Sequence, residues 1–95
     1  MTKVPSPELK LEIKKLIMET LNINDINPED VDEEKPLFGS DNVLTLDSVD
    51  AIEIIMALQR TYGIRISDQT AARYVIRSVN SIAEFILSEQ EKTNL

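Results

Sequence analysis

The chain has 95 residues, of which 42% are hydrophobic, and its 17 acidic against 10 basic residues give a formal net charge of −7. A chain of this length has room for one hydrophobic core, so we expect a single domain spanning residues 1–95. With 2 glycines, 4 prolines and 4% aromatic residues, the composition favours helices over short strands. The negative charge opposes binding to nucleic acid or to an anionic membrane.

The sequence contains neither cysteine nor histidine. Disulfides, thiolate chemistry and the usual general base are therefore missing, and we expect a cytoplasmic protein that is not an enzyme. No apolar stretch approaches the length of a membrane span or of a signal-peptide core, so membrane insertion is not expected.

The first predicted helix runs from about Pro7 to Leu21. Ser6 can cap it, and proline suits the first helical position. Apolar residues recur at helical spacing: Leu9, Ile13, Leu16, Ile17 and Leu21. We place the charged residues on other faces: Glu12, Lys14, Lys15 and Glu19. Residues 1–5 are expected to be frayed.

Residues 22–46 lack sustained helical periodicity, and they contain Pro28, Pro36 and Gly39. Apolar residues are nevertheless spread along the segment: Ile23, Ile26, Val31, Leu37, Phe38, Val43 and Leu44. We expect a long loop packed against the core, with a short turn at residues 28–30. Its acids alternate at Asp30, Asp32 and Glu34, but the spacing fails the EF-hand pattern, so we predict no metal site.

The second predicted helix runs from about Ser48 to Thr61, before a stop at Gly63. At about 100° per residue, one sector should face the core: Ile52, Ile55, Leu58 and Tyr62. The polar residues fall largely opposite, on the solvent side: Asp50, Glu53 and Arg60. Val49 and Met56 lie at the edge of this polar face, where burial in the bundle is not required.

The remaining chain predicts an extended linker at residues 64–66 and two further helices. Ser67 or Asp68 should cap a short helix carrying Ala71, Ala72, Val75 and Ile76, and Ser78 should cap a last helix with Ile82, Phe85 and Ile86 facing inward. Residues 89–95 are expected to be frayed, which leaves a core of about 7–88. The predicted fold is all-α: a small bundle of three main helices and one short helix, with a long loop between helices one and two.

The stretch LTLDSVDAIEIIMAL, from Leu44 to Leu58, resembles the Asp-Ser-Leu attachment motif and the following helix of the acyl carrier protein family. The similarity continues through residues 62–66 and 78–86. It implies that Ser48 carries a covalent phosphopantetheine arm flanked by Asp47 and Asp50, and that the thiol of the arm holds acyl groups as thioesters. It also implies a role in fatty acid or polyketide biosynthesis. The implied partners are a phosphopantetheinyl transferase and acyl-processing enzymes such as a ketosynthase, acyltransferase or ligase, with the chain itself a monomer.

Ser48 opens a helix, where unsatisfied N–H groups would favour a phosphate. Asp47 and Asp50 would repel it, so modification should depend on a transferase that supplies cationic groups or Mg²⁺. Alone, an Asp-Ser pair before a helix would be a cap. A hydrolase serine is disfavoured because no histidine and no Gly-x-Ser-x-Gly elbow accompanies it.

We predict a partner-docking face on the second helix, in which an apolar strip is framed by acids: Asp47, Val49, Asp50, Glu53 and Met56. Val49 and Met56 could instead simply flank the core. Departures from the family pattern favour a specialised carrier over a housekeeping one: Val49 for leucine, Thr45 for glycine, and Gln59 and Arg60 for acids. An unmodified acidic helical adaptor and an aminoacyl or peptidyl carrier remain as alternatives. The bundle interior could also open to shelter part of an acyl chain.

Overall fold

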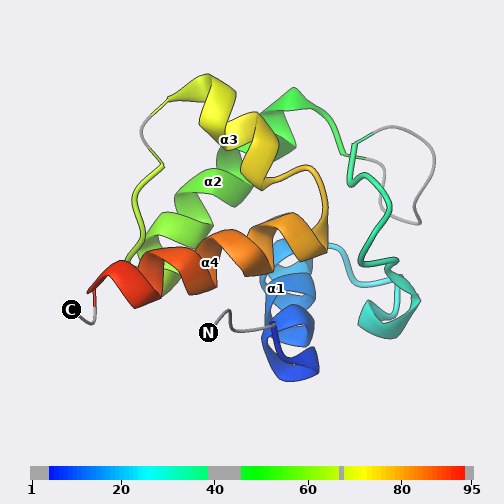
Figure 1. The fold of residues 1–95 in the computed structure, drawn as a ribbon. Coiled ribbons are helices and arrows are strands. Elements are labelled where there is room, and N and C mark those ends of the chain that lie inside the picture. The colour runs from blue at the N-terminus through cyan, green and yellow to red at the C-terminus, as the bar shows by residue number, and fades with distance from the viewer. Residues whose placement is uncertain (1–4, 39–45, 67, 94–95) are drawn as a thin grey trace.

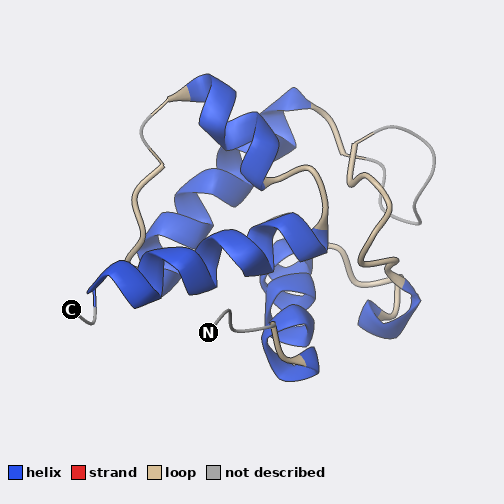
Figure 2. Ribbon diagram, viewed as in Figure 1, coloured by secondary structure: helices blue, strands red, loops and turns tan. Residues whose placement is uncertain are grey.

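The computed structural model describes residues 5–38, 46–66 and 68–93 (Figure 1). They form α1 (Pro7–Thr20), η1 (Pro28–Asp30), α2 (Ser48–Tyr62), α3 (Gln69–Val75) and α4 (Val79–Thr93). Within these ranges there is no strand, and a single isolated bridge joins Phe38 to Leu46 (Figure 2). The all-α prediction, with three main helices and one short one, is confirmed. None of the described helices is long and apolar enough to cross a membrane.

The helix ends follow the predicted capping residues. Ser6 Oγ accepts from the Leu9 N–H at 3.1 Å, and Asp68 Oδ1 accepts from the Ala71 N–H at 2.7 Å. The other candidate cap of α3, Ser67, lies outside the described residues. Ser78 caps α4 by accepting from the Ser81 N–H at 3.1 Å. The expected fraying after residue 88 is wrong as far as residue 93, because α4 continues to Thr93.

The core lies where α1 packs against α4 and α2, and where α3 packs against α4 (Figure 1). Its largest fully buried side chains come from α1, the long loop, α2 and α4: Ile13, Ile17, Leu37, Ile54, Leu58, Val79, Ile82 and Ile86. The core prediction for α2 is confirmed at Leu58 and wrong at Ile52, whose side chain is 60% exposed. Ile55 and Tyr62 are half-buried against the core, and Ile54 occupies the central position instead.

The long first loop is fastened to the core, as predicted. It buries Val31, Leu37 and Leu46, and its short turn forms η1. Two backbone hydrogen bonds tie it to the second half of the chain: the Leu37 N–H donates to Arg77 O at 2.9 Å, and the Asn80 N–H donates to Glu33 O at 3.0 Å. Other loop residues for which contacts were expected lie outside the described residues: Val43 and Leu44.

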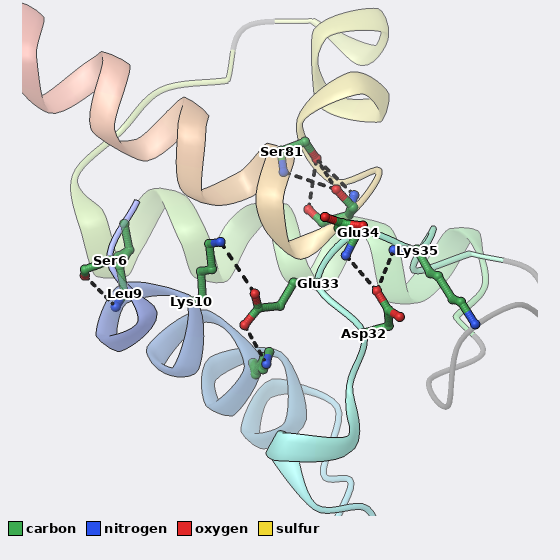
Figure 3. A network of polar contacts seen from close by, with 10 residues as sticks. Ser6, Leu9, Lys10, Asp32, Glu33, Glu34, Lys35 and Ser81 are labelled. Atoms are coloured by element: carbon green, nitrogen blue, oxygen red, sulfur yellow. Dashed lines mark hydrogen bonds and ion pairs between the residues drawn. The ribbon is translucent and has the colours of Figure 1, made fainter. Parts of the chain in front are cut away.

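Two ion pairs of Glu33 reinforce this attachment (Figure 3). Glu33 Oε2 lies 2.9 Å from Lys14 Nζ, and its other carboxylate oxygen lies 3.5 Å from Lys10 Nζ. The hydrogen bond from Lys14 holds the pKa of Glu33 below its ordinary value of 4.5. Lys14, which we placed on a face other than that of the apolar residues, is nearly buried: its side chain is 8% exposed, because its ammonium group pairs with Glu33 of the long loop.

Asp32 folds the acidic segment on itself (Figure 3). Its Oδ1 accepts from the N–H groups of Glu34 at 2.9 Å and of Lys35 at 3.1 Å. These two bonds lower the pKa of Asp32 from its ordinary value of 3.8. This carboxylate therefore stabilises a turn of the loop.

Candidate functional site

A reciprocal capping box forms the start of α2. Asp47 Oδ1 accepts from the N–H groups of Val49 at 3.1 Å and of Asp50 at 3.0 Å. In return, Asp50 Oδ2 accepts from the Asp47 N–H at 3.0 Å. Both acids that flank Ser48 in the sequence thus fix the backbone at the first turn of the helix.

Ser48 is the first residue of α2, and Asp47, not Ser48, is its cap. The side chain of Ser48 is exposed and makes no hydrogen bond to another described residue. The expectation that unsatisfied N–H groups await a phosphate is wrong for Val49 and Asp50, because the Asp47 carboxylate already occupies both donors. The Ser48 hydroxyl is therefore presented to solvent on a rigid helix start and is not needed to hold that start together.

A groove of about 490 Å³ opens beside Ser48. Most of its lining is apolar, and two arginines contribute the basic groups: Pro36, Phe38, Leu46, Asp47, Ser48, Ala51, Arg73, Ile76 and Arg77. The lining comes from the long loop, the start of α2, and the end of α3 with the residues after it. The bundle thus brings together three segments that are far apart in the sequence.

Backbone pairing holds these segments in register. Phe38 and Leu46 form the isolated bridge, and the Leu46 N–H donates to Leu37 O at 3.4 Å. The Leu37 N–H in turn donates to Arg77 O. Ser48 follows Leu46 by two residues, so this chain of contacts fixes its position relative to the end of α3.

The outer face of α2 carries a strip of exposed apolar side chains. Val49 is 62% exposed, Ile52 60% and Met56 54%. Around a helix that turns about 100° per residue, Ile52 lies about 60° from Val49 and about 40° from Met56. The predicted exposure of Val49 and Met56 is confirmed, and Ile52 joins them. Glu53 is exposed beside this strip, and Asp50 is half-buried.

Sequence reasoning missed the groove residues opposite α2, above all Arg73 and Arg77. The available signal was the reversal of charge along the chain, from the acidic middle to arginines at positions 60, 65, 73 and 77. That reversal could not indicate which arginines approach Ser48, because the placement depends on how α3 packs.

Comparison with known proteins identifies the family to which the chain belongs. Residues 12–86 match the family model described as "Phosphopantetheine attachment site". The chain is also 37% identical over 75 residues to the acyl carrier protein of Wolinella succinogenes, which covers 79% of this chain and 88% of that protein. The chain belongs to the acyl carrier protein family.

A second carrier, the mitochondrial acyl carrier protein of Neurospora crassa, is 40% identical over 50 residues, covering 53% of this chain and 36% of that protein. No solved structure matches the chain described in this structure. Membership of the family gives the chain a covalently attached phosphopantetheine group and a role as an acyl carrier, as the sequence motif predicted. The exposed hydroxyl at the start of α2, beside an apolar groove, fits such a group.

Proposed function

We propose that Ser48 is the attachment residue, and that the thiol of its phosphopantetheine arm carries acyl or polyketide-type intermediates as thioesters. One observation supports this most strongly: Ser48 is an exposed hydroxyl at the start of α2 that the helix does not use as its cap. The residues beside it fit the same role, because the groove offers apolar surface to an arm that leaves the Ser48 oxygen.

In this proposal the chain holds the Ser48 hydroxyl in place, and the transferase provides the groups that catalyse the attachment. Attachment forms a bond from Ser48 Oγ to the phosphorus of a phosphopantetheine donor. The phosphoanhydride P–O bond of that donor breaks, so the nucleotide part leaves with its own phosphate, and the Ser48 hydroxyl proton leaves to a base. The sequence has no histidine or cysteine, and the carboxylates of Asp47 and Asp50 are engaged in the capping box, so we assign that base to the transferase. Asp47 and Asp50 are engaged with backbone N–H groups and keep Ser48 at a fixed point of the helix. Their negative charge requires cationic groups or Mg²⁺ on the transferase.

The proposed docking face consists of the apolar strip Val49, Ile52 and Met56 with the acids Asp47, Asp50 and Glu53 around it. A partner would bury the strip and meet the acids with basic side chains. The strip begins next to Ser48 and runs along α2, so a docked enzyme would lie close to the arm. The partners we propose are the transferase and acyl-processing enzymes such as a ketosynthase, acyltransferase or ligase.

We further propose a specialised carrier over a housekeeping one. Arg60 is exposed on α2, at a position where the family pattern led us to expect an acid, and Arg73 and Arg77 are exposed beside the groove. A partner with a basic surface that recognises only the negative charge of carriers would be repelled by these three arginines. We also propose that the protein is cytoplasmic and monomeric and consists of a single domain.

The attachment is tested by intact mass after co-expression with a broad-specificity phosphopantetheinyl transferase. The parent chain should gain the mass of one phosphopantetheine group, and Ser48→Ala should gain none. Ser6→Ala is the matched control, because Ser6 is also an exposed serine at a helix start, and it should gain the group fully. A parent chain without mass gain would favour the unmodified adaptor.

The docking face is tested by the kinetics of that modification. The triple variant Val49→Ala, Ile52→Ala and Met56→Ala should lower kcat/KM roughly tenfold, which corresponds to about 1.4 kcal/mol of lost contact energy. Leu11→Ala is the control, because Leu11 is an exposed apolar residue of α1. Unchanged kcat/KM for the triple variant, and unchanged binding to acyl-processing partners, would refute the docking face.

A further inference from the structure

The groove beside Ser48 carries two arginines that no part of the proposed attachment chemistry uses. Arg73 is on α3, and Arg77 lies in the connection to α4, and both line this groove together with Ser48. Both side chains are exposed, and neither forms an ion pair with another described residue. Their charge is therefore available to a ligand in the groove.

The negative charge around Ser48 makes such cations useful. Asp47 and Asp50 flank the hydroxyl, and their carboxylates are held at the helix start by the capping box. Asp47 also occupies the N–H groups of Val49 and Asp50, so these donors are not open to a phosphate. A phosphodiester on Ser48 would add a further negative charge beside two carboxylates, and it needs donors from elsewhere.

Arg73 and Arg77 are placed to provide them. The Leu37 N–H donates to the Arg77 carbonyl, and the Leu46 N–H donates to the Leu37 carbonyl. Leu46 lies two residues before Ser48. The backbone of Arg77 is thus fixed relative to the attachment residue. The Arg77 guanidinium lies 6.0 Å from the centroid of the Tyr74 ring, and Tyr74 does not line the groove, so Arg77 would turn from this ring to reach a phosphate on Ser48.

We infer that Arg73 and Arg77 bind the phosphodiester of the arm carried by Ser48. The inference rests on the proposed attachment at Ser48. A guanidinium donates two parallel N–H groups to phosphate oxygens, so two arginines can offset the charge of Asp47 and Asp50. Holding the phosphate on this side directs the start of the arm toward the apolar groove lining, where Phe38 and Ile76 are available for contact.

The test uses the full chain after modification, with intact mass showing that each variant carries the arm. In ³¹P NMR, the phosphodiester resonance of the parent protein should shift as salt is raised, because salt weakens the arginine contacts. In the double variant Arg73→Gln with Arg77→Gln, the phosphodiester resonance at low salt should already lie near the position that the parent reaches at high salt. Raising the salt should then move the resonance much less than in the parent. Arg60→Gln is the matched control, because Arg60 is an exposed arginine of α2 that does not line the groove, and it should behave as the parent.

A second readout is the change in Tm on modification, measured for each variant against its own unmodified form. At low salt, modification should raise the Tm of the parent and of Arg60→Gln by more than it raises the Tm of the double variant. An unaltered ³¹P position, salt response and Tm gain in the modified double variant would overturn the inference and leave attachment at Ser48 intact. A parent chain that gains no mass would instead refute the attachment, and the inference with it.

Discussion

Replacing Glu33 by glutamine tests how the long loop is fastened to the bundle. The substitution keeps the size of the side chain but removes the charge that faces Lys14 Nζ at 2.9 Å. The Lys14 side chain is 8% exposed, so its ammonium group would be left nearly buried without a counter-charge. The Glu33 backbone, whose carbonyl accepts from the Asn80 N–H, joins the loop to α4 at the same point.

Removing one partner of a buried pair typically costs about 3–5 kcal/mol. The Glu33 side chain is 35% exposed, so solvent screens part of the interaction, and we expect a loss of about 2 kcal/mol in the free energy of unfolding. For a domain of this size, that loss lowers Tm by roughly 8–16 °C. Lys14→Met should cost less than about 1 kcal/mol, because it removes the buried charge itself and keeps its apolar contacts.

Thermal and urea unfolding followed by circular dichroism measures both changes. Glu34→Gln is the control, because Glu34 is an exposed neighbouring acid, and its effect should stay within about 0.5 kcal/mol. If Lys14→Met were as destabilising as Glu33→Gln, the pair itself, not an uncompensated lysine, would carry the stability, and our reasoning would be wrong.

Three further predictions concern the helix start, the faces of α2 and pH. Asp47→Ala should lower stability by about 1 kcal/mol through loss of the cap, whereas Ser48→Ala should change it by less than about 0.5 kcal/mol; equal losses in thermal melts would contradict the assignment of the cap. Ile54→Ala should cost about 2–5 kcal/mol by opening a cavity, and Ile52→Ala less than about 0.5 kcal/mol; the reverse order in urea unfolding would return Ile52 to the core. The pKa values of Glu33 and Asp32 are lowered in the folded chain, so the stability they contribute is present above their ordinary values of 4.5 and 3.8 and is lost as the pH falls below them. Tm should therefore drop between about pH 5 and pH 3, less steeply in Glu33→Gln; an equal slope in that variant would contradict the role of Glu33.

Local rules predicted most of the helix boundaries. Ser6, Asp68 and Ser78 cap their helices, and Gly63 ends α2 with a left-handed φ of 64°. Such signals act over three or four residues, so the sequence alone contains them. The end of α4 was missed because its last turns carry few apolar residues, although the helix continues to Thr93.

The faces of α2 were harder to predict. Ile52 and Ile54 are both isoleucines, and the helix alone does not determine which of them meets α1. The choice depends on where α1 and α4 pack, and the core lies on the side of Ile54 and Leu58. The strip of Val49, Ile52 and Met56 is consequently longer than the predicted pair.

Contacts between distant segments were beyond sequence reasoning. Lys14 pairs with Glu33 across the long loop, and Arg73 and Arg77 reach the groove of Ser48 from the other end of the chain. A charge run indicates an excess of one sign but not which groups meet. These pairings need the three-dimensional arrangement of the loop and α3.

The most direct test of the central claim locates the phosphopantetheine group on the chain. After modification by the transferase, the protein is digested, and tandem mass spectrometry assigns the residue that carries the added group. We predict that the group is found on Ser48 alone and is lost completely in Ser48→Ala. A group located on any other residue, or a fully modified Ser48→Ala chain, would contradict the account.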